Sequence, residues 1–280
     1  SSDLEQKKKY LPDLLSGKKL GAFGLTEPNA GTDASGQQTR AELVGDKWII
    51  NGAKVFITNG GYADVFVVMA MTDKSKGNHG ISAFIVEKDD PGFSIGKTED
   101  KMGICASSTT ELIFQNCEIP ADRLLGQVGE GFKVAMSTLD GGRIGIASQA
   151  LGIAQGAFDV TVEYMQQRKQ FGKKLSQMQA LQFSMADLKT KIEAARLLVY
   201  KAADMKDKHM NYGEAAAMAK LFAAETAMEV TTKCVQYHGG YGYTKDYPVE
   251  RMMRDAKITE IYEGTSEVQR MVIAGKTFKK

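Results

Sequence analysis

The sequence predicts an α+β protein in which an antiparallel β-barrel or sandwich is followed by a helix bundle. Three observations lead to this prediction: short β-branched runs in the first half, long helical periodicities in the second, and no proline between Pro120 and Pro248. Because no helical pattern separates the first runs, a barrel or sandwich is favoured over a βαβ fold. We expect a linker at 1–17, a β domain at 18–127 and a helical domain at 128–280.

The strands of the β domain are predicted from short runs rich in β-branched and aromatic residues, bounded by Gly, Asn or Asp. Such runs cover residues 47–52, 54–58, 65–71, 81–86 and 110–114. We expect a glycine turn between the first two, which makes them separate strands. The last run ends before Pro120.

The helices are predicted from apolar residues that recur every three or four positions. One stripe contains Leu181, Met185, Leu188, Ile192, Ala195 and Val199. A similar pattern covers 215–235 and closes at Gly239-Gly240, a typical helix C-terminal signal. Residues 132–164 hold either one long helix or a broken pair. Helices of such lengths suit an antiparallel bundle.

The bulk composition excludes several classes of function. Of the 280 residues, 43% are hydrophobic and 25% charged, which is typical of a soluble globular protein. The net charge of +2 gives no reason to expect nucleic acid or an anionic membrane as a partner. The cysteines, Cys105, Cys117 and Cys234, show no CxxC spacing, so we expect reduced thiols and no metal site. The three histidines are also too scattered for a metal cluster.

Two segments carry candidate chemistry. Glu263 follows two bulky residues and precedes Gly264, so it is either a solvated cap residue or a carboxylate in a dry pocket. In the pocket its pKa would rise and it could take a proton. Residues 24–36 are rich in Gly, Ser and Thr, which permits a phosphate-rich ligand but also fits an ordinary polar loop. Neither GxGxxG nor GxxxxGK[ST] occurs there.

Five segments in order resemble motifs of the acyl-CoA dehydrogenase family. Residues 25–33 (LTEPNAGTD) are similar to its first signature, and residues 236–255, from QYHGGYGY to RD, to its second. Residues 56–61 (FITNGG), 168–173 (RKQFGK) and 261–265 (IYEGT) match further family segments. The resemblance covers nearly the whole chain and points to the short-chain, butyryl-CoA branch.

This resemblance implies a fold, a cofactor and a reaction. Family members have an N-terminal helical domain, a central β domain and a C-terminal four-helix bundle. Residues 1–17 would then be a linker or the remnant of an absent first domain. The implied reaction is FAD-dependent α,β-dehydrogenation of a short-chain acyl-CoA such as butyryl-CoA to the 2-enoyl-CoA. The implied electron acceptor is electron-transfer flavoprotein.

The catalytic base implied by the resemblance is Glu263. Its backbone N–H and the flavin ribityl chain would hydrogen-bond to the thioester carbonyl, which is oxyanion-type stabilisation. Isovaleryl- and long-chain-type members place the base at the position matched by Gly142. Because glycine carries no carboxylate, this position favours Glu263 and the short- or medium-chain branch.

The ligand-binding residues are also implied by matching positions. The FAD residues are Phe23, Leu25, Thr26, Thr32, Phe56, Ile57, Thr58, Arg168, Phe171, Gln179, Gln236, Gly239, Gly240, Thr265 and Glu267. The acyl-CoA residues are Thr32, Asp140, Arg143 and Gly264. Some of the FAD residues reach the cofactor of a neighbouring subunit in the family, so we expect a homo-oligomer, a dimer or tetramer.

Two alternatives stay open. One is a truncated, inactive scaffold that binds flavin or serves assembly, and the other, ranked last, is an acyl-CoA oxidase. No targeting segment is visible at the N-terminus. We expect a bacterial cytoplasmic location, with the mitochondrial matrix as the alternative.

Overall fold

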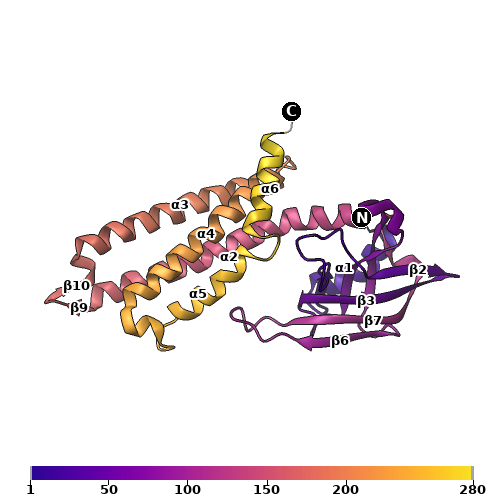
Figure 1. Ribbon diagram of the computed structural model, residues 1–280, viewed down its shortest axis with the longest axis horizontal. Coiled ribbons are helices and arrows are strands. Elements are labelled where there is room, and N and C mark those ends of the chain that lie inside the picture. Colours follow the sequence, from indigo (N-terminus) through magenta and orange to yellow (C-terminus); the bar gives the residue numbers. More distant parts are fainter. Residues whose placement is uncertain (1, 279–280) are drawn as a thin grey trace. The chain divides into compact units, whose positions relative to one another are not determined.

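The computed structural model describes residues 2–278, which form two compact units (Figure 1). The first comprises residues 2–101 and 105–138, and the second comprises 102–104 and 139–278. The sheet lies in the first unit, and the second unit is mostly helical. The predicted α+β organisation is therefore confirmed. The domain boundaries proposed from the sequence stay a prediction. Among the described helices, none is both long and apolar enough to span a membrane.

The first unit is built on one mixed sheet, in which most neighbouring strands are antiparallel. Its order is β6-β7-β3-β2-β4-β5-β8, and β1 pairs in parallel with β4, as β2 does at its end. The strand bounds are β1 (Gly21–Gly24), β2 (Arg40–Val44), β3 (Lys47–Thr58), β4 (Val65–Met71), β5 (Ile81–Glu87), β6 (Phe93–Thr98), β7 (Thr109–Pro120) and β8 (Leu124–Leu125).

The core of this unit forms where aromatic side chains from neighbouring strands meet. Trp48 and Ile50, two residues apart on β3, are both buried, as the period of a strand requires. The ring of Trp48 packs edge-on against Phe84, with 5.1 Å between centroids. Phe66 of β4 is fully buried in the same cluster. Fully burying a side chain of this size stabilises a fold by about 1.5–3 kcal/mol.

The predicted glycine turn in β3 is wrong, because Lys47–Thr58 is a single strand. Its pairing with β7 shifts register on passing Gly52 and again on passing Phe56. Gly52 has φ +143°, and a methyl group there would lie 2.5 Å from Oγ1 of Thr39. The glycine therefore marks a bulge with a close backbone approach, and the strand continues beyond it.

Helix α1 (Leu4–Leu15) covers most of the segment expected to be a linker. Its buried side chains fasten it to the first unit. The amide of Gln6 donates to the carbonyl oxygen of Leu124 over 2.8 Å. The hydroxyl of Tyr10 donates to Oε1 of Glu87 over 2.7 Å. These residues are thus part of the packed β unit.

The second unit contains most of the long helices. The bounds are α2 (Gly131–Gln167), α3 (Gln179–Asp207), α4 (Gly213–His238), α5 (Val249–Lys257) and α6 (Ser266–Thr277), with the β9 (Lys169–Gln170) and β10 (Lys173–Lys174) hairpin between α2 and α3. The short 3-10 helices are η1 (Lys74–Gly80) and η2 (Ala121–Arg123) in the first unit, and η3 (Leu175–Gln177), η4 (Gly239–Tyr243) and η5 (Ile258–Glu260) in the second. Of the two alternatives for 132–164, the single long helix is confirmed.

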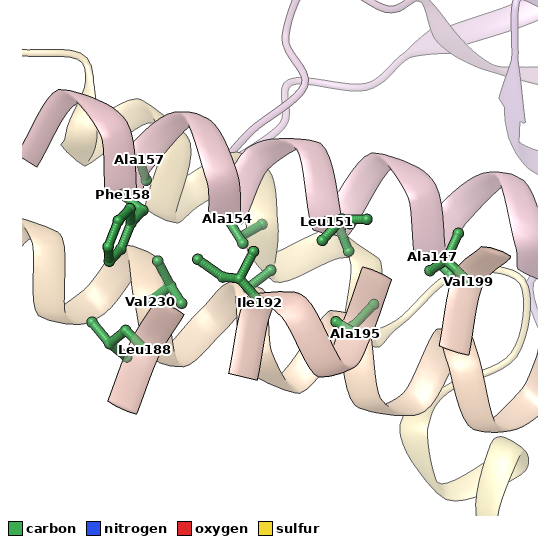
Figure 2. Close-up of a cluster of buried hydrophobic side chains, with 14 of the residues drawn as sticks. Ala147, Leu151, Ala154, Ala157, Phe158, Leu188, Ile192, Ala195, Val199 and Val230 are labelled. Atoms are coloured by element: carbon green, nitrogen blue, oxygen red, sulfur yellow. The ribbon is translucent and has the colours of Figure 1, made fainter. Parts of the chain in front are cut away.

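The core of the second unit lies between α2, α3 and α4. Figure 2 shows Ile192 of α3 beside Ala154 of α2, and Phe158 of α2 near Val230 of α4. The predicted stripe on α3 is confirmed, since its members from Met185 to Val199 are all buried. Helix α4 contributes mainly alanines, which let neighbouring helices approach closely.

Hydrogen bonds from Arg254 and to Asp255 hold the loop of residues 102–104 in the second unit. Nη1 of Arg254 donates to the carbonyl oxygen of Met102 over 2.7 Å. Oδ1 of Asp255 accepts from the backbone N–H of Ile104 over 2.6 Å. A methyl group on Gly103, between them, would lie 2.5 Å from the carbonyl oxygen of Arg254. These contacts explain why residues 102–104 belong to the helical unit.

A buried ion pair supports the loop that follows β1. Nζ of Lys54 donates to the carbonyl oxygen of Leu25 (3.0 Å), to Oε1 of Glu27 (2.7 Å) and to Oε1 of Gln37 (2.9 Å). Burial lowers the pKa of Lys54 to about 8. Although burial acts to raise it, Lys54 holds the pKa of Glu27 below its usual value. The loop is therefore fixed to β3 by one cation.

We predict that Lys54→Met destabilises the protein by about 3 kcal/mol, because it leaves the carboxylate of Glu27 buried without its cation. The measurement is the free energy of unfolding in denaturant. The matched control is Lys47→Met on the same strand, whose exposed pair with Glu118 spans 2.8 Å. That variant is expected to lose less than about 1 kcal/mol. Equal losses in the two variants would contradict the prediction.

Candidate active site

Glu263 lies in the short segment between η5 and α6, and its backbone is unusual. Its φ is +55°, and Gly264 follows with φ +88°. A left-handed conformation costs a residue other than glycine about 1–2 kcal/mol. Thr265 then caps α6, since its hydroxyl accepts from the N–H of Val268 over 3.4 Å. The turn therefore needs support from its surroundings.

Two side chains provide this support by holding the carbonyl oxygen of Gly264. Nζ of Lys220 on α4 donates to it over 2.8 Å. Nε2 of Gln269 on α6 donates to it over 2.8 Å, and to the carbonyl oxygen of Glu263 over 3.2 Å. Lys220 and Gln269 are fully buried. The backbone on both sides of the Glu263–Gly264 bond is thus fixed.

The carboxylate of Glu263 lies against the backbone of α2 at Gly142. A methyl group on Gly142 would lie 2.5 Å from Oε2 of Glu263, so the carboxylate uses the space that a side chain would fill. Burial raises the pKa of Glu263, while the nearby charges of Arg143 and Lys220 act to lower it. Such a carboxylate can bind and release a proton closer to neutral pH than an exposed glutamate.

Arg143 forms a short ion pair with Asp140, three residues earlier on α2. The guanidinium is buried, and its Nε has no hydrogen-bond partner among the described residues. Of the four predicted acyl-CoA residues, Asp140, Arg143 and Gly264 lie in this unit around Glu263. Thr32 lies in the first unit, on an exposed turn.

Two neighbouring segments hold all but one of the predicted flavin residues that lie in the first unit. Phe23 is on β1, Leu25 and Thr26 follow it, and the N–H of Val55 on β3 donates to the carbonyl oxygen of Thr26 over 2.9 Å. Phe56 lies next on β3, with φ +59° and a side chain that is 64% exposed. The adjoining Ile57 and Thr58 are buried and exposed respectively.

Phe56 therefore does not serve the core, which would be the usual place for a phenylalanine in a strand. A bulge with a left-handed backbone turns its ring to the surface. Large exposed apolar side chains on strained backbone are typical of ligand-binding positions.

A third group of predicted residues lines a cavity of about 730 Å³ in the second unit. Arg168, Gln236, Gly239 and Gly240 all contribute to its wall. The guanidinium of Arg168 lies over the ring of Tyr241, 5.5 Å from its centroid. The cavity combines a cation, an amide and aromatic rings, which suits a ligand with phosphates and a planar base.

The other predicted cofactor residues lie outside this cavity. Phe171 is at the turn of the β9–β10 hairpin and is 96% exposed, and Gln179 is exposed at the start of α3. Thr265 and Glu267 lie in the first turn of α6, next to Glu263. The described residues contain no cluster of three or more His, Cys, Asp or Glu side chains that could hold a metal.

Sequence reasoning missed Lys220, Gln269 and Lys54. A signal existed for Lys220, because it stands four residues after Ala216 and three before Ala223, on the buried face of α4. A charged residue at a core position of a helix is rare unless it has a partner. No comparable signal marks Gln269, whose role depends on the turn it holds.

Comparisons with known proteins agree with these features. Residues 22–117 match the family model described as acyl-CoA dehydrogenase, middle domain, and residues 129–277 match the model for the C-terminal domain. The short-chain-specific acyl-CoA dehydrogenase of Clostridium acetobutylicum is 64% identical over 275 residues, which are 98% of this chain and 73% of that protein.

Solved structures give the same picture. The butyryl-CoA dehydrogenase of Megasphaera elsdenii superposes with a TM-score of 0.98 at 60% identity, over 99% of this chain and 73% of that one. A chain in a structure described as the electron transferring flavoprotein of Acidaminococcus fermentans has a TM-score of 0.98 at 63% identity, with the same coverage. The chain therefore belongs to the acyl-CoA dehydrogenase family, whose middle and C-terminal domains it contains.

Proposed function

We propose that this protein catalyses the FAD-dependent α,β-dehydrogenation of short-chain acyl-CoA thioesters such as butyryl-CoA. The observation that carries this proposal is the carboxylate of Glu263, half-buried against Gly142 with a raised pKa. The proposal agrees with the similarity to short-chain-specific and butyryl-CoA dehydrogenases.

Glu263 is proposed as the base that removes the proton from the α-carbon of the thioester. Its ionised oxygen accepts this proton, and the raised pKa makes the carboxylate a stronger base than an exposed glutamate. The anchored turn fixes the direction of the side chain, and a fixed orientation lowers the barrier by avoiding reorganisation. The carboxylate of Glu263 fills the space that a side chain at position 142 would occupy. A carboxylate carried by residue 263 or by residue 142 would therefore reach the same part of the site.

FAD is the cofactor, and residues in both units fit parts of it. When bound, FAD accepts the hydride that leaves the β-carbon. The exposed ring of Phe56 offers a stacking surface for a planar ring system, and the Thr58 hydroxyl is exposed next to it. The cavity around Arg168 offers paired N–H donors to a pyrophosphate. Phe23, Leu25, Thr26, Thr32, Ile57, Phe171, Gln179, Gln236, Gly239, Gly240, Thr265 and Glu267 are proposed as further FAD residues.

The acyl-CoA is proposed to contact Thr32, Asp140, Arg143 and Gly264. Because Arg143 is buried beside Glu263, we expect it to act near the reacting end of the substrate. Its unpaired Nε is a donor that a bound ligand or water can satisfy.

Electron-transfer flavoprotein is proposed as the electron acceptor, which the similarity to the Acidaminococcus chain supports. We further propose a homo-oligomer, a dimer or tetramer, and a bacterial cytoplasmic location, since the relatives named above are bacterial. Residues 18–127 are proposed as the flavin and acyl-CoA domain, and residues 128–280 as the domain that carries the base and the oligomer contacts.

The test is an anaerobic titration of the FAD-loaded protein with butyryl-CoA, following the flavin absorbance band. The wild-type band is expected to bleach, whereas Glu263→Gln should bind FAD and reduce it at least about 10³-fold more slowly, because an amide cannot accept the α-proton. A wild-type band that stays oxidised would favour an inactive scaffold. Rapid reoxidation when air is admitted would favour an oxidase.

Gly142→Ala provides a steric test of the same site. Its methyl group would meet Oε2 of Glu263 at 2.5 Å, so the carboxylate must move and flavin reduction should slow by about tenfold or more. The matched control is Gly145→Ala on the same helix, where a methyl group meets nothing within 4 Å. If both variants reduce FAD at the wild-type rate, the carboxylate does not act from this position.

Arg168→Ala tests the proposed FAD cavity. Loss of the guanidinium should weaken FAD retention by about tenfold or more, because a charge-assisted hydrogen bond contributes about 1.5–3 kcal/mol. The measurement is the FAD content after dialysis, with Lys189→Ala, an exposed charge on α3, as control. Unchanged FAD content in Arg168→Ala would assign Arg168 to the solvated surface.

A further inference from the structure

Lys220 is a buried cation that the proposed reaction does not itself use. It lies on the alanine-rich face of α4 and is fully buried. Within residues 2–278 its ammonium group forms no direct ion pair, and it donates instead to the carbonyl oxygen of Gly264. Burial lowers its pKa to about 8. Burying an ammonium group is expensive, so its retention here calls for a specific role.

The hydrogen bond from Lys220 reaches the residue that follows the proposed base. Glu263 and Gly264 both have positive φ, and Glu263 bears the cost of this conformation. The carbonyl of Gly264 is held from two elements, by Lys220 of α4 and by Gln269 of α6. A rotation of the Glu263–Gly264 backbone would break both bonds. Lys220 therefore opposes relaxation of the turn to an ordinary conformation.

The charge of Lys220 acts on the same carboxylate. The charged groups around Lys220 are Glu260 of η5, Glu263, Glu267 of α6 and Arg143 of α2. The three carboxylates favour its charged form, and Arg143 opposes it. At Glu263, Lys220 and Arg143 both favour the ionised carboxylate against the effect of burial. The ammonium group thus helps to keep Glu263 able to accept a proton.

We propose that Lys220 is a positioning residue for the base: it fixes the turn at Glu263–Gly264 by its hydrogen bond and keeps the Glu263 carboxylate ionised by its charge. This inference rests on the proposed role of Glu263. It gives α4 a role at the base, in addition to the alanines that this helix contributes to the core and Gln236 that it contributes to the cavity. The two effects can be separated, because glutamine can donate a hydrogen bond without carrying a charge.

The test uses the FAD-loaded protein and the rate of flavin reduction by butyryl-CoA, measured in single-turnover experiments from about pH 5 to about pH 9. Lys220→Met loses the charge and the hydrogen bond, and Lys220→Gln loses the charge alone. In both variants the acid limb of the rate profile should move up by about one pH unit, since one cation is removed near the carboxylate. Lys233→Met, an exposed lysine on the same helix, should leave the limb in place.

The hydrogen bond has its own readout. Lys220→Met should increase amide hydrogen exchange in residues 263–269, whereas Lys220→Gln should retain most of the protection. An acid limb that stays at the wild-type pH in both variants would overturn the electrostatic part. Equal exchange in Lys220→Met and wild type would overturn the positioning part. If Lys220→Met fails to fold with FAD, Lys220→Gln still decides whether the charge matters.

A double-variant cycle separates this inference from the proposed reaction. Lys220→Gln, Glu263→Gln and the double variant are compared by their unfolding free energies, which do not depend on catalysis. The two substitutions should be non-additive near pH 7, and the coupling should shrink toward additivity as pH falls to about 4, because protonation removes the charge of Glu263. Additivity at both pH values would overturn the coupling. If instead Glu263→Gln reduces FAD normally while the coupling persists, Glu263 is not the base, but its interaction with Lys220 is confirmed.

Discussion

The site depends on one constraint, the placement of the half-buried Glu263 carboxylate beside the bare backbone of Gly142. In this placement the backbone of Glu263 is left-handed, and Gly264, which follows it, also has a positive φ. The protein stabilises the conformation from outside the turn, through Lys220 and Gln269. Burial raises the pKa of the Glu263 carboxyl group, and the nearby charges of Arg143 and Lys220 act to lower it. Burial and the nearby cations thus have opposing effects on the pKa of Glu263.

A similar arrangement occurs in the first unit, around a different ligand-binding segment. Lys54, another buried lysine, binds the backbone of the loop after β1 and holds it on β3. Two residues further along that strand, the bulge exposes Phe56. In both units an ammonium group that is fully buried fixes irregular backbone that carries proposed functional residues. Rigid support of this kind positions a site more accurately than a free loop does.

Much of the fold follows from local patterns, which explains why it could be predicted. The buried stripe from Met185 to Val199 and the glycine end of α4 need little tertiary information. Gly52 has the sequence signature of a turn, but glycine has the same signature in a bulge, and the pairing of β3 with β7 decides between the two. The functional site is harder to predict from the sequence than the fold. Glu263 could be chosen only through family resemblance, since its positive φ and its burial arise from contacts with α2, α4 and α6.

The measurement that tests the central claim most directly is an infrared titration of Glu263, with Glu263→Gln as the spectroscopic blank. The difference spectrum isolates the C=O stretch of the protonated carboxyl group. The structure predicts that the midpoint at which this band is lost lies above pH 4.5, the ordinary pKa of a glutamate, because burial favours the protonated form. A midpoint at or below pH 4.5 would contradict it, and Glu263 would then be a solvated carboxylate.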